Sequence, residues 1–204
     1  MKKLLIVLMA SFIGQGASAQ LSVSPEIGYQ FSKTRYEIAG ARDNGAFKQG
    51  IRAGASIGLG VMSHFELRGG AFFSGKGGKA DFLGSDVSHT INYIDIPVFL
   101  NYITGKAMGN RFFIGAGPYW AYTIGGSSKA LGIKRDLEIG SQITDDVKPM
   151  DFGLNANAGF ILFNGIYIKG MYAHGLKNIL PAGNSNNSIR NATLSVSLGY
   201  NYVF

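Results

Sequence analysis

Apolar and polar residues alternate at every second position in the last fifteen residues, Arg190 to Phe204. Apolar or aromatic residues occupy the even positions, and small or polar residues occupy most of the odd positions. A strand in a water-soluble sheet also alternates, but it is commonly only about 5–6 residues long. A tilted strand that crosses a bilayer needs about 9–11 residues, with apolar side chains toward lipid and aromatic residues at the interfaces. The segment therefore predicts a transmembrane β-strand.

The same alternation recurs along the chain and predicts eight strands. The predicted strands are Leu21–Thr34, Gly50–Val61, Phe65–Phe73, Thr90–Tyr102, Arg111–Thr123, Met150–Phe163, Ile166–His174 and Arg190–Phe204. Short connections follow the second, fourth and sixth strands, and Asn164-Gly165 in the last of them is typical of a two-residue hairpin. The long polar connections are Arg35–Gln49, Ser74–Ser88, Ile124–Pro149 and Gly175–Ile189.

This strict alternation of long and short connections is typical of outer-membrane barrels, which have short periplasmic turns and long external loops. A soluble up-and-down barrel, such as a lipocalin, does not require alternating long and short connections. The sequence therefore predicts an all-β fold, an eight-stranded antiparallel up-and-down transmembrane β-barrel. The even number of strands places both termini on the periplasmic side.

The N-terminal residues have the order of a secretory signal peptide. Lys2 and Lys3 precede a short apolar core, and Ala17-Ser18-Ala19 provides a small-x-small cleavage site. We expect a signal peptide at residues 1–19, cleavage between Ala19 and Gln20, and a barrel domain at residues 20–204. The alternative is an N-terminal anchor helix, which the shortness of the apolar core disfavours.

The amino-acid composition limits which classes of partner and cofactor are expected. The chain has no cysteine, so it forms neither disulfides nor a thiolate metal site, and no metal-ligand spacing is present. The formal net charge is +7, but the basic residues are scattered rather than clustered. We therefore expect no nucleic-acid partner and no cofactor. We do expect contact with outer-membrane lipids, including lipopolysaccharide, whose phosphates would attract basic loops.

Charged residues on the predicted inward face form a candidate site. The interior of an eight-stranded barrel is just filled by side chains. The inward set includes Glu26, Arg52, Glu66, Arg68, Asp95, Asp151 and Lys169. Because an isolated buried charge is costly, these side chains are expected to pair in a structural ion network that plugs the lumen. The alternative is a narrow path for ions or protons.

Candidates for catalysis are few. Histidine occurs at His64, His89 and His174, with the first at the periplasmic rim and the others toward the external side. His174 with a loop serine such as Ser185 could imitate the catalytic set of a lipid A-modifying barrel enzyme, but no motif joins them. Gly70 to Lys76 lacks the Ser/Thr and the following helix of a phosphate-binding loop. We therefore predict that the protein is not an enzyme.

Two prolines contradict an uninterrupted ladder. Pro97 and Pro118 lie in the middle of neighbouring predicted strands, where each removes a backbone donor. Counting from the turn between the strands places them nearly opposite one another. We expect a shared bulge or kink there.

Four stretches together resemble the PorT-type outer-membrane β-barrel family of Gram-negative bacteria. They are Tyr93-Ile94-Asp95-Ile96-Pro97-Val98, Gly115-Ala116-Gly117-Pro118-Tyr119, Asp151-Phe152-Gly153-Leu154, and the segment from Tyr172 to Ile179 with its Gly-Leu-Lys-Asn core. The resemblance implies mainly a location in the outer membrane, and it makes the two prolines family features. The namesake is linked to secretion of surface proteases.

Three functions are consistent with these observations. The leading one is a structural or interaction role, such as adhesion or binding, through the external loops and a possible protein partner. The alternative is an accessory role in secretion or transport, and the third is lipid A modification. Tyr200, Tyr202 and Phe204 resemble the C-terminal signal by which the barrel-assembly machinery recognises its substrates. We expect a monomer.

Overall fold

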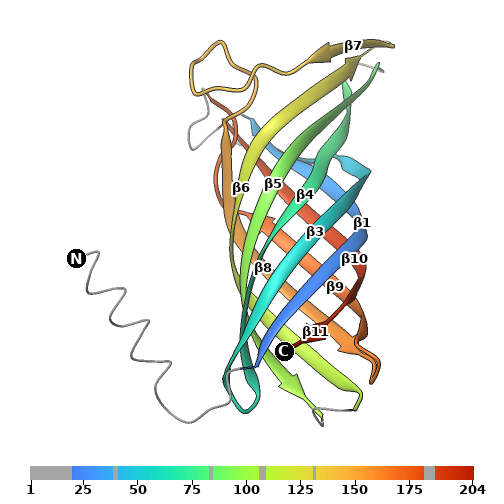
Figure 1. Cartoon of the computed structure of the whole chain (residues 1–204). Helices are drawn as coiled ribbons and strands as arrows, with labels where there is room; N and C mark the ends of the chain where they lie inside the picture. The colour runs from blue at the N-terminus through green and yellow to red at the C-terminus, as the bar shows by residue number, and fades with distance from the viewer. Residues whose placement is uncertain (1–19, 39–40, 83–84, 106–108, 131, 182–186) are drawn as a thin grey trace, which may run out of the picture.

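The computed structural model describes residues 20–38, 41–82, 85–105, 109–130, 132–181 and 187–204, in which eleven β-strands form one antiparallel sheet (Figure 1). The long strands are β1 (Leu21–Ile38), β3 (Ala46–Met62), β4 (Phe65–Phe82), β5 (Ser85–Thr104), β6 (Arg111–Ala130), β8 (Met150–Ile161), β9 (Ile166–Gly175) and β10 (Asn187–Tyr200). The short strands are β2 (Ala41–Asn44), β7 (Ile133–Asp136) and β11 (Tyr202–Val203). Within the described ranges no helix is long and apolar enough to cross a membrane.

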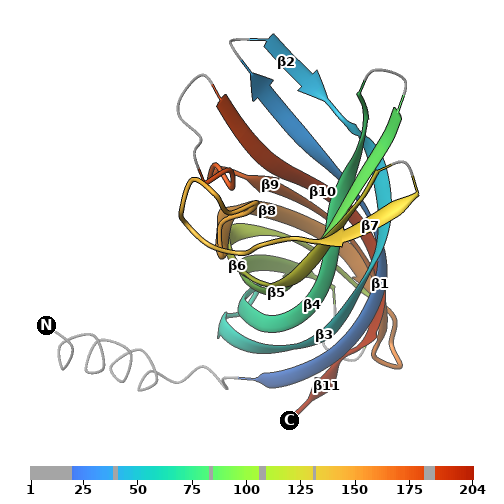
Figure 2. The same ribbon diagram turned by 90° about the horizontal axis from the view of Figure 1, so that it is seen from above.

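The sheet closes on itself, as the view from above shows (Figure 2). The strand β10 pairs with β9 on one side and with β1 on the other, where the register runs from Glu26 opposite Gly199 to Ile38 opposite Asn187. After Asn201, the strand β11 continues the pairing with β1. The prediction of an eight-stranded antiparallel barrel closed by the C-terminal strand is confirmed.

The outer surface carries an apolar band bordered by aromatic residues. On β6, Ile114 is 52% exposed, with Phe112 at one end of the apolar run and Tyr122 at the other. Ten steps of about 3.3 Å, tilted by about 40°, span about 25 Å, which is the height of the lipid-facing band of such barrels. On other strands, Tyr102 packs on Phe65 at one border, with ring centroids 5.3 Å apart. The alternation therefore identified the lipid-facing side chains.

The strands are longer than predicted at the end opposite the chain termini. β1 extends to Ile38, β4 to Phe82 and β6 to Ala130, so most of the predicted loops Arg35–Gln49 and Ser74–Ser88 is strand. Beyond Tyr122, β6 runs for eight more residues, or about 20 Å along the barrel axis. The hydrophobic pattern ends where lipid ends, whereas backbone pairing continues between polar residues in water. This is why the predicted strand ends were wrong.

Of the bulge or kink predicted at the two prolines, the bulge is absent. On one side, Gly69 pairs with Val98 and Phe72 with Asp95, so the register is the same before and after Pro97. On the other side, the β5–β6 register is likewise the same on both sides of the prolines, with Pro97 opposite Tyr119 and Leu100 opposite Ala116. The register shift of this ladder occurs instead at Asn92 and Tyr93, nearer the outer end. The barrel thus tolerates two missing donors without inserting a residue.

The end that holds both chain termini has tight turns. Gly165 has a φ of 89°, as the predicted Asn164-Gly165 hairpin requires, and its amide donates to the carbonyl of Leu162 at 2.9 Å. The described chain begins at the same end, where Gln20 is exposed. The predicted signal peptide and Ala19 lie outside the described residues. Short turns and both termini identify this end as periplasmic, because barrels of this class have that asymmetry.

Candidate functional site

Charged side chains that are removed from solvent gather inside the barrel. Among the described residues, eight charged residues are 9% exposed or less: Glu26, Arg52, Glu66, Arg68, Lys76, Asp95, Asp151 and Lys169. Seven of them are the residues that the sequence predicts to face inward. The eighth, Lys76, falls in a predicted external loop. With it, the set contains four cations and four carboxylates and is electrically balanced.

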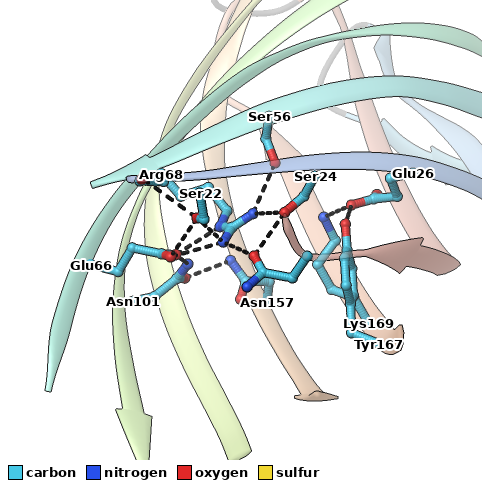
Figure 3. A network of polar contacts seen from close by, with 12 residues as sticks. Ser22, Ser24, Glu26, Ser56, Glu66, Arg68, Asn101, Asn157, Tyr167 and Lys169 are labelled. Atoms are coloured by element: carbon cyan, nitrogen blue, oxygen red, sulfur yellow. Dashed lines mark hydrogen bonds and ion pairs between the residues drawn. The ribbon is translucent and has the colours of Figure 1, made fainter. Parts of the chain in front are cut away.

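Arg68 and Glu66 form the layer nearest the periplasmic end (Figure 3). Arg68 donates from Nε to Glu66 Oε1 at 2.7 Å and from Nη2 to Oε2 at 2.8 Å, a bidentate pair. Its guanidinium also donates, at distances of 2.6–3.2 Å, to Ser22 and Ser24 on β1, Ser56 on β3 and Asn201 between β10 and β11. Asn101 donates to Glu66 at 3.1 Å. One planar guanidinium therefore ties four segments together across the bore.

Glu26 is the centre of the next layer. Its Oε2 accepts from the ammonium of Lys169 and, at 2.9 Å, from the hydroxyl of Tyr167, both on β9 (Figure 3). Its Oε1 lies 3.7 Å from Nε of Arg52. Arg52 in turn stacks on the ring of Phe72, with its guanidinium carbon 3.7 Å from the centroid. β1, β3 and β9 thus meet at one buried carboxylate, and β4 supplies the ring on which Arg52 stacks.

Asp95 joins Arg52 to Lys76. Nη1 of Arg52 lies 3.6 Å from Oδ2 of Asp95, and Nζ of Lys76 donates to Oδ1 at 2.8 Å. Lys76 also lies over two tyrosine rings, 4.8 Å from the centroid of Tyr93 and 4.7 Å from that of Tyr119. Its position on β4 follows the inward parity of Glu66 and Arg68. That parity, together with the excess of one negative charge in the predicted set, was the available signal for Lys76.

Asp151 is fully buried without an ion pair among the described residues. Its Oδ2 accepts from the hydroxyl of Tyr119 at 3.2 Å and from Nδ2 of Asn191 at 3.0 Å. Asn191 also donates to the hydroxyl of Tyr93 at 3.3 Å. Asn191 was not predicted as a site residue, because the predicted set of lumen residues contained only charged side chains.

An apolar layer covers Asp151 on the external side. Ile91, Val147 and Ile179 are each 3% exposed or less and pack in one cluster with Tyr93 and Tyr119. Val147 and Ile179 come from the segments between strands, which are tied together where the amide of Lys148 donates to the carbonyl of Ile179 at 2.9 Å. These two segments fold inward over the lumen.

Cavities occur in the lower lumen and at both mouths of the barrel. A cavity of about 20 Å³ lies in the lower lumen, beside Arg68 and Lys169. The periplasmic mouth holds one of about 130 Å³ near His64 and Arg111. The external mouth holds one of about 190 Å³, bordered mainly by apolar side chains around Leu137. The polar network and the apolar layer lie between these two mouths.

In the described ranges, the three histidines contact aromatic, hydroxyl and guanidinium groups. His64 lies at the periplasmic turn and stacks on Tyr102, with centroids 5.8 Å apart. Nε2 of His89 lies 2.8 Å from Oγ1 of Thr34. His174 is contacted by Arg35, and Ser185 lies outside the described residues. Within the described ranges, no group of three histidine, aspartate or glutamate side chains is positioned to hold a metal ion.

The residues of the predicted assembly signal lie at the periplasmic end and face outward. Tyr200, Tyr202 and Phe204 are 37%, 53% and 78% exposed, and the rings of the two tyrosines lie 4.3 Å apart. Their exposure leaves them accessible to a recognition partner.

A family described as outer membrane protein beta-barrel domain matches residues 13–180. No curated protein matches the sequence significantly.

Several solved outer-membrane proteins have similar folds at low sequence identity. OprG of Pseudomonas aeruginosa is 13% identical, with a TM-score of 0.53 over 93% of this chain and 98% of that chain. Ail of Yersinia pestis, in complex with the heparin analogue sucrose octasulfate, is 12% identical, with a TM-score of 0.43 over 90% and 99%. Neisserial surface protein A is 13% identical, with a TM-score of 0.43 over 91% and 99%. At these identities the likeness to OprG indicates a shared fold.

Proposed function

The chain belongs to the outer membrane protein β-barrel domain family, and on that premise we propose that it is an outer-membrane barrel with a plugged lumen whose external end has a structural or interaction role. The protein is located in the outer membrane. The plug and the role of the external end are the proposal.

The main observation in support of a plugged lumen is the balanced network of eight buried charges. A conducting pore keeps its charged side chains hydrated, whereas those of this lumen contact one another and are almost removed from solvent. The cavity within the network, about 20 Å³, has room for about one water molecule. Val147 and Ile179 add an apolar cover above it.

Apolar side chains exposed to water at the external end support an interaction role. Ile133 on β7 is 74% exposed, and Ile143 in the following segment is 84% exposed. Neither lies in the lipid-facing band, so lipid does not explain their exposure. A contiguous exposed apolar patch outside a membrane is a common mark of a binding surface, and we propose that both residues contribute to one.

Planar-bilayer recording tests the plug. The wild-type protein should give no steady conductance steps. The variant Arg52→Ala/Phe72→Ala, which removes the stacked pair at the centre of the network, should produce them. Steady steps from the wild type would contradict a plugged lumen and would favour an ion path.

Site-specific photo-crosslinking in living cells tests the interaction role. A crosslinking residue at Ile133 or Ile143 should capture a defined protein partner. The matched control is the same residue at Met62, which is 66% exposed at the periplasmic turn and should not capture it. Capture at none of the external positions would favour a purely structural role.

A second candidate is the secretion accessory role implied by PorT-type resemblance. Inward residues of three of the resembling stretches, Tyr93, Tyr119 and Asp151, meet in one buried cluster, and Ile179 from the fourth packs on it. Asp95 is linked to the two tyrosines through Lys76. Deleting the gene should then reduce the amount of surface-exported protein. Unchanged export would exclude this role.

The remaining alternative is lipid A modification. The contacts of His174 with Arg35 and Tyr172 do not resemble an activated catalytic histidine, which supports a non-enzymatic role. Expression of the protein should leave the lipid A mass spectrum unchanged. A new lipid A species dependent on His174 would overturn this expectation.

A further inference from the structure

Three cations lie close together on the outward face of the barrel wall. Lys33 and Arg35 are on β1, and Arg190 is on β10, directly opposite Arg35 in the antiparallel register. Their parity is that of the lipid-facing residues of the same strands, such as Tyr29 and Leu194. They therefore project from the outer wall and not into the lumen.

Arg35 lies across β10 and reaches β9. Its Nη2 donates to Nδ1 of His174 at 2.7 Å and to the hydroxyl of Tyr172 at 3.2 Å. Ala192, which is in register between Lys33 and His174, is 2% exposed although it faces outward. Because a guanidinium only donates, the accepting Nδ1 of His174 is unprotonated in this contact. Arg35 is thus held in place by neutral groups.

The positive charge of this cluster is not balanced by an ion pair. Arg35 and Arg190 lie directly opposite each other in the sheet, and like charges in this arrangement repel and destabilise the pair of strands. In the part of the chain that the structure describes, no carboxylate forms an ion pair with Lys33, Arg35 or Arg190. Glu37 is farther from the membrane on the same face, opposite Ser188. The three cations therefore give this surface an uncompensated positive charge, which suits the binding of an anion.

The position of the cluster along the barrel axis, just beyond the apolar band, indicates which anion it binds. Tyr29 and Phe31, whose rings meet edge to face at 5.3 Å, precede Lys33 on β1. Tyr172 precedes His174 on β9 and is 45% exposed. These aromatic residues form the outer border of the apolar band, where the headgroups of the outer leaflet begin. Basic side chains just beyond such a border attract lipid phosphates.

We propose that Lys33, Arg35 and Arg190, together with Tyr172 and His174, bind a phosphate group of an outer-leaflet lipid of the lipid A type. The acyl chains lie against the apolar wall below, and the phosphate replaces the missing counter-charge between the two arginines. Bidentate donation by guanidinium groups suits phosphate oxygens. Lys33, which lies over the ring of Phe47 at 5.3 Å, supplies a further cation.

The test is a lipid-binding titration by native mass spectrometry of the detergent-solubilised full-length protein. Bisphosphorylated lipid A should bind the wild type, and Arg35→Gln/Arg190→Gln should bind it on the order of tenfold more weakly. Dephosphorylated lipid A should bind both proteins equally weakly. Equal affinity of the two proteins for bisphosphorylated lipid A overturns the proposal.

Two controls define the site and the source of the phosphate. Lys129→Gln/Lys134→Gln removes another pair of opposed cations, from the tip of β6 and β7, and should leave lipid affinity unchanged. Loss of affinity in this control would show non-specific attraction and overturn the proposal. Millimolar inorganic phosphate should not displace the lipid, and displacement would assign the site to free phosphate instead.

A second variant covers the case in which the double arginine variant does not fold. Lys33→Gln/Arg190→Gln leaves the contacts of Arg35 with Tyr172 and His174 intact. It should also weaken binding of bisphosphorylated lipid A. Unchanged binding by this folded variant overturns the proposal equally.

Discussion

At the residue scale, the lumen depends on charge balance. Glu26, Asp95, Glu66 and Asp151 are offset by four cations, one of which, Lys76, is 2% exposed. Desolvation of each ion is costly, so every buried charge is tolerated because a partner of opposite charge or several hydrogen-bond donors face it. Removing one member leaves its partner uncompensated in a low-dielectric bore.

Replacing Lys76 with methionine tests this balance. Lys76→Met keeps the length of the side chain but leaves Asp95 with the more distant Arg52 alone. We expect the free energy of unfolding to fall by about 3–5 kcal/mol. Urea unfolding in lipid vesicles, followed through the fluorescence of the single tryptophan, Trp120, measures it.

The control for this prediction is Lys129→Met. Lys129 is exposed at the end of β6, so its replacement should change stability by less than about 0.5 kcal/mol. Equal stability of the two variants would mean that the buried pair contributes nothing.

In the external segment, the contacts of Asp146 with Glu138 and Arg135 depend on pH. Partial burial opposes its ionisation, but the backbone amide of Glu138 and the guanidinium of Arg135 outweigh burial and hold the pKa of Asp146 below its usual value. The folded pKa is lowered, so the contacts are fully present above the ordinary value of about 3.9 and are lost as pH falls through the lower value.

NMR of the Glu138 amide measures this titration. Its chemical shift should be constant from pH 7 to about pH 5 and should change with a midpoint below about 3.9. Asp146→Asn should abolish the transition. A midpoint above the ordinary value would contradict the prediction.

At the scale of elements, a strand of this barrel has two parts with different origins. The part in the lipid band is specified by side chains, because apolar residues must face lipid and polar residues must face the lumen. The part beyond the band, such as the outer ends of β4 and β5, is held by backbone pairing, from Gly78 opposite His89 to Phe82 opposite Ser85. The C-terminal β10 and β11 lie mainly in the first part.

Deleting Phe204 tests the role of the C-terminal strand in assembly. The backbone amide of Phe204 donates to the carbonyl of Leu21 at 2.8 Å, but its side chain is 78% exposed and adds little to the finished fold. We expect the amount of protein in the outer membrane to fall several-fold, while the refolded variant stays within about 1 kcal/mol of the wild type. Quantitative blotting and urea unfolding measure the two effects.

Phe163→Ala is the matched control for this deletion. Phe163 is 76% exposed at a periplasmic turn, so it resembles Phe204 in exposure but not in position. Its replacement should leave membrane levels unchanged. Normal levels of the Phe204 deletion would rule out the assembly signal.

At the scale of the whole molecule, stability comes from closure. β10 pairs with β1, so within the described ranges the eight long strands each have two neighbours and the barrel has no free edge in the lipid band. Apart from the positions beside Pro97 and Pro118, which have no amide to donate, the backbone groups in the band can then pair without water.

Heat-modifiable electrophoresis tests closure. The unboiled protein should resist dodecyl sulfate and migrate differently from the boiled protein, because a closed hydrogen-bonded sheet unfolds cooperatively. The Lys76→Met variant should lose the folded band at a lower temperature than the wild type. Identical migration of boiled and unboiled wild type would count against a closed barrel.

The sequence by itself determined the number of strands, the pairing of the last strand with the first, and the parity of each side chain. It could do so because lipid and lumen impose opposite polarity on alternate residues, and this requirement is local. For the same reason, parity placed Glu26, Arg52 and Asp95 in the lumen. The outer ends of the strands left no such pattern, since water faces both sides of them.

Only the tertiary structure decided which charges meet and where the ladder is irregular. Lys76 on β4 reaches Asp95 diagonally on the neighbouring strand β5. Arg35 on β1 reaches His174 on β9 across β10, which barrel closure brings beside β1. Register likewise depends on every neighbouring ladder at once, so the irregularity occurs at Tyr93 and not at Pro97. Contacts of this kind have no local signature, because they depend on the curvature and closure of the whole sheet.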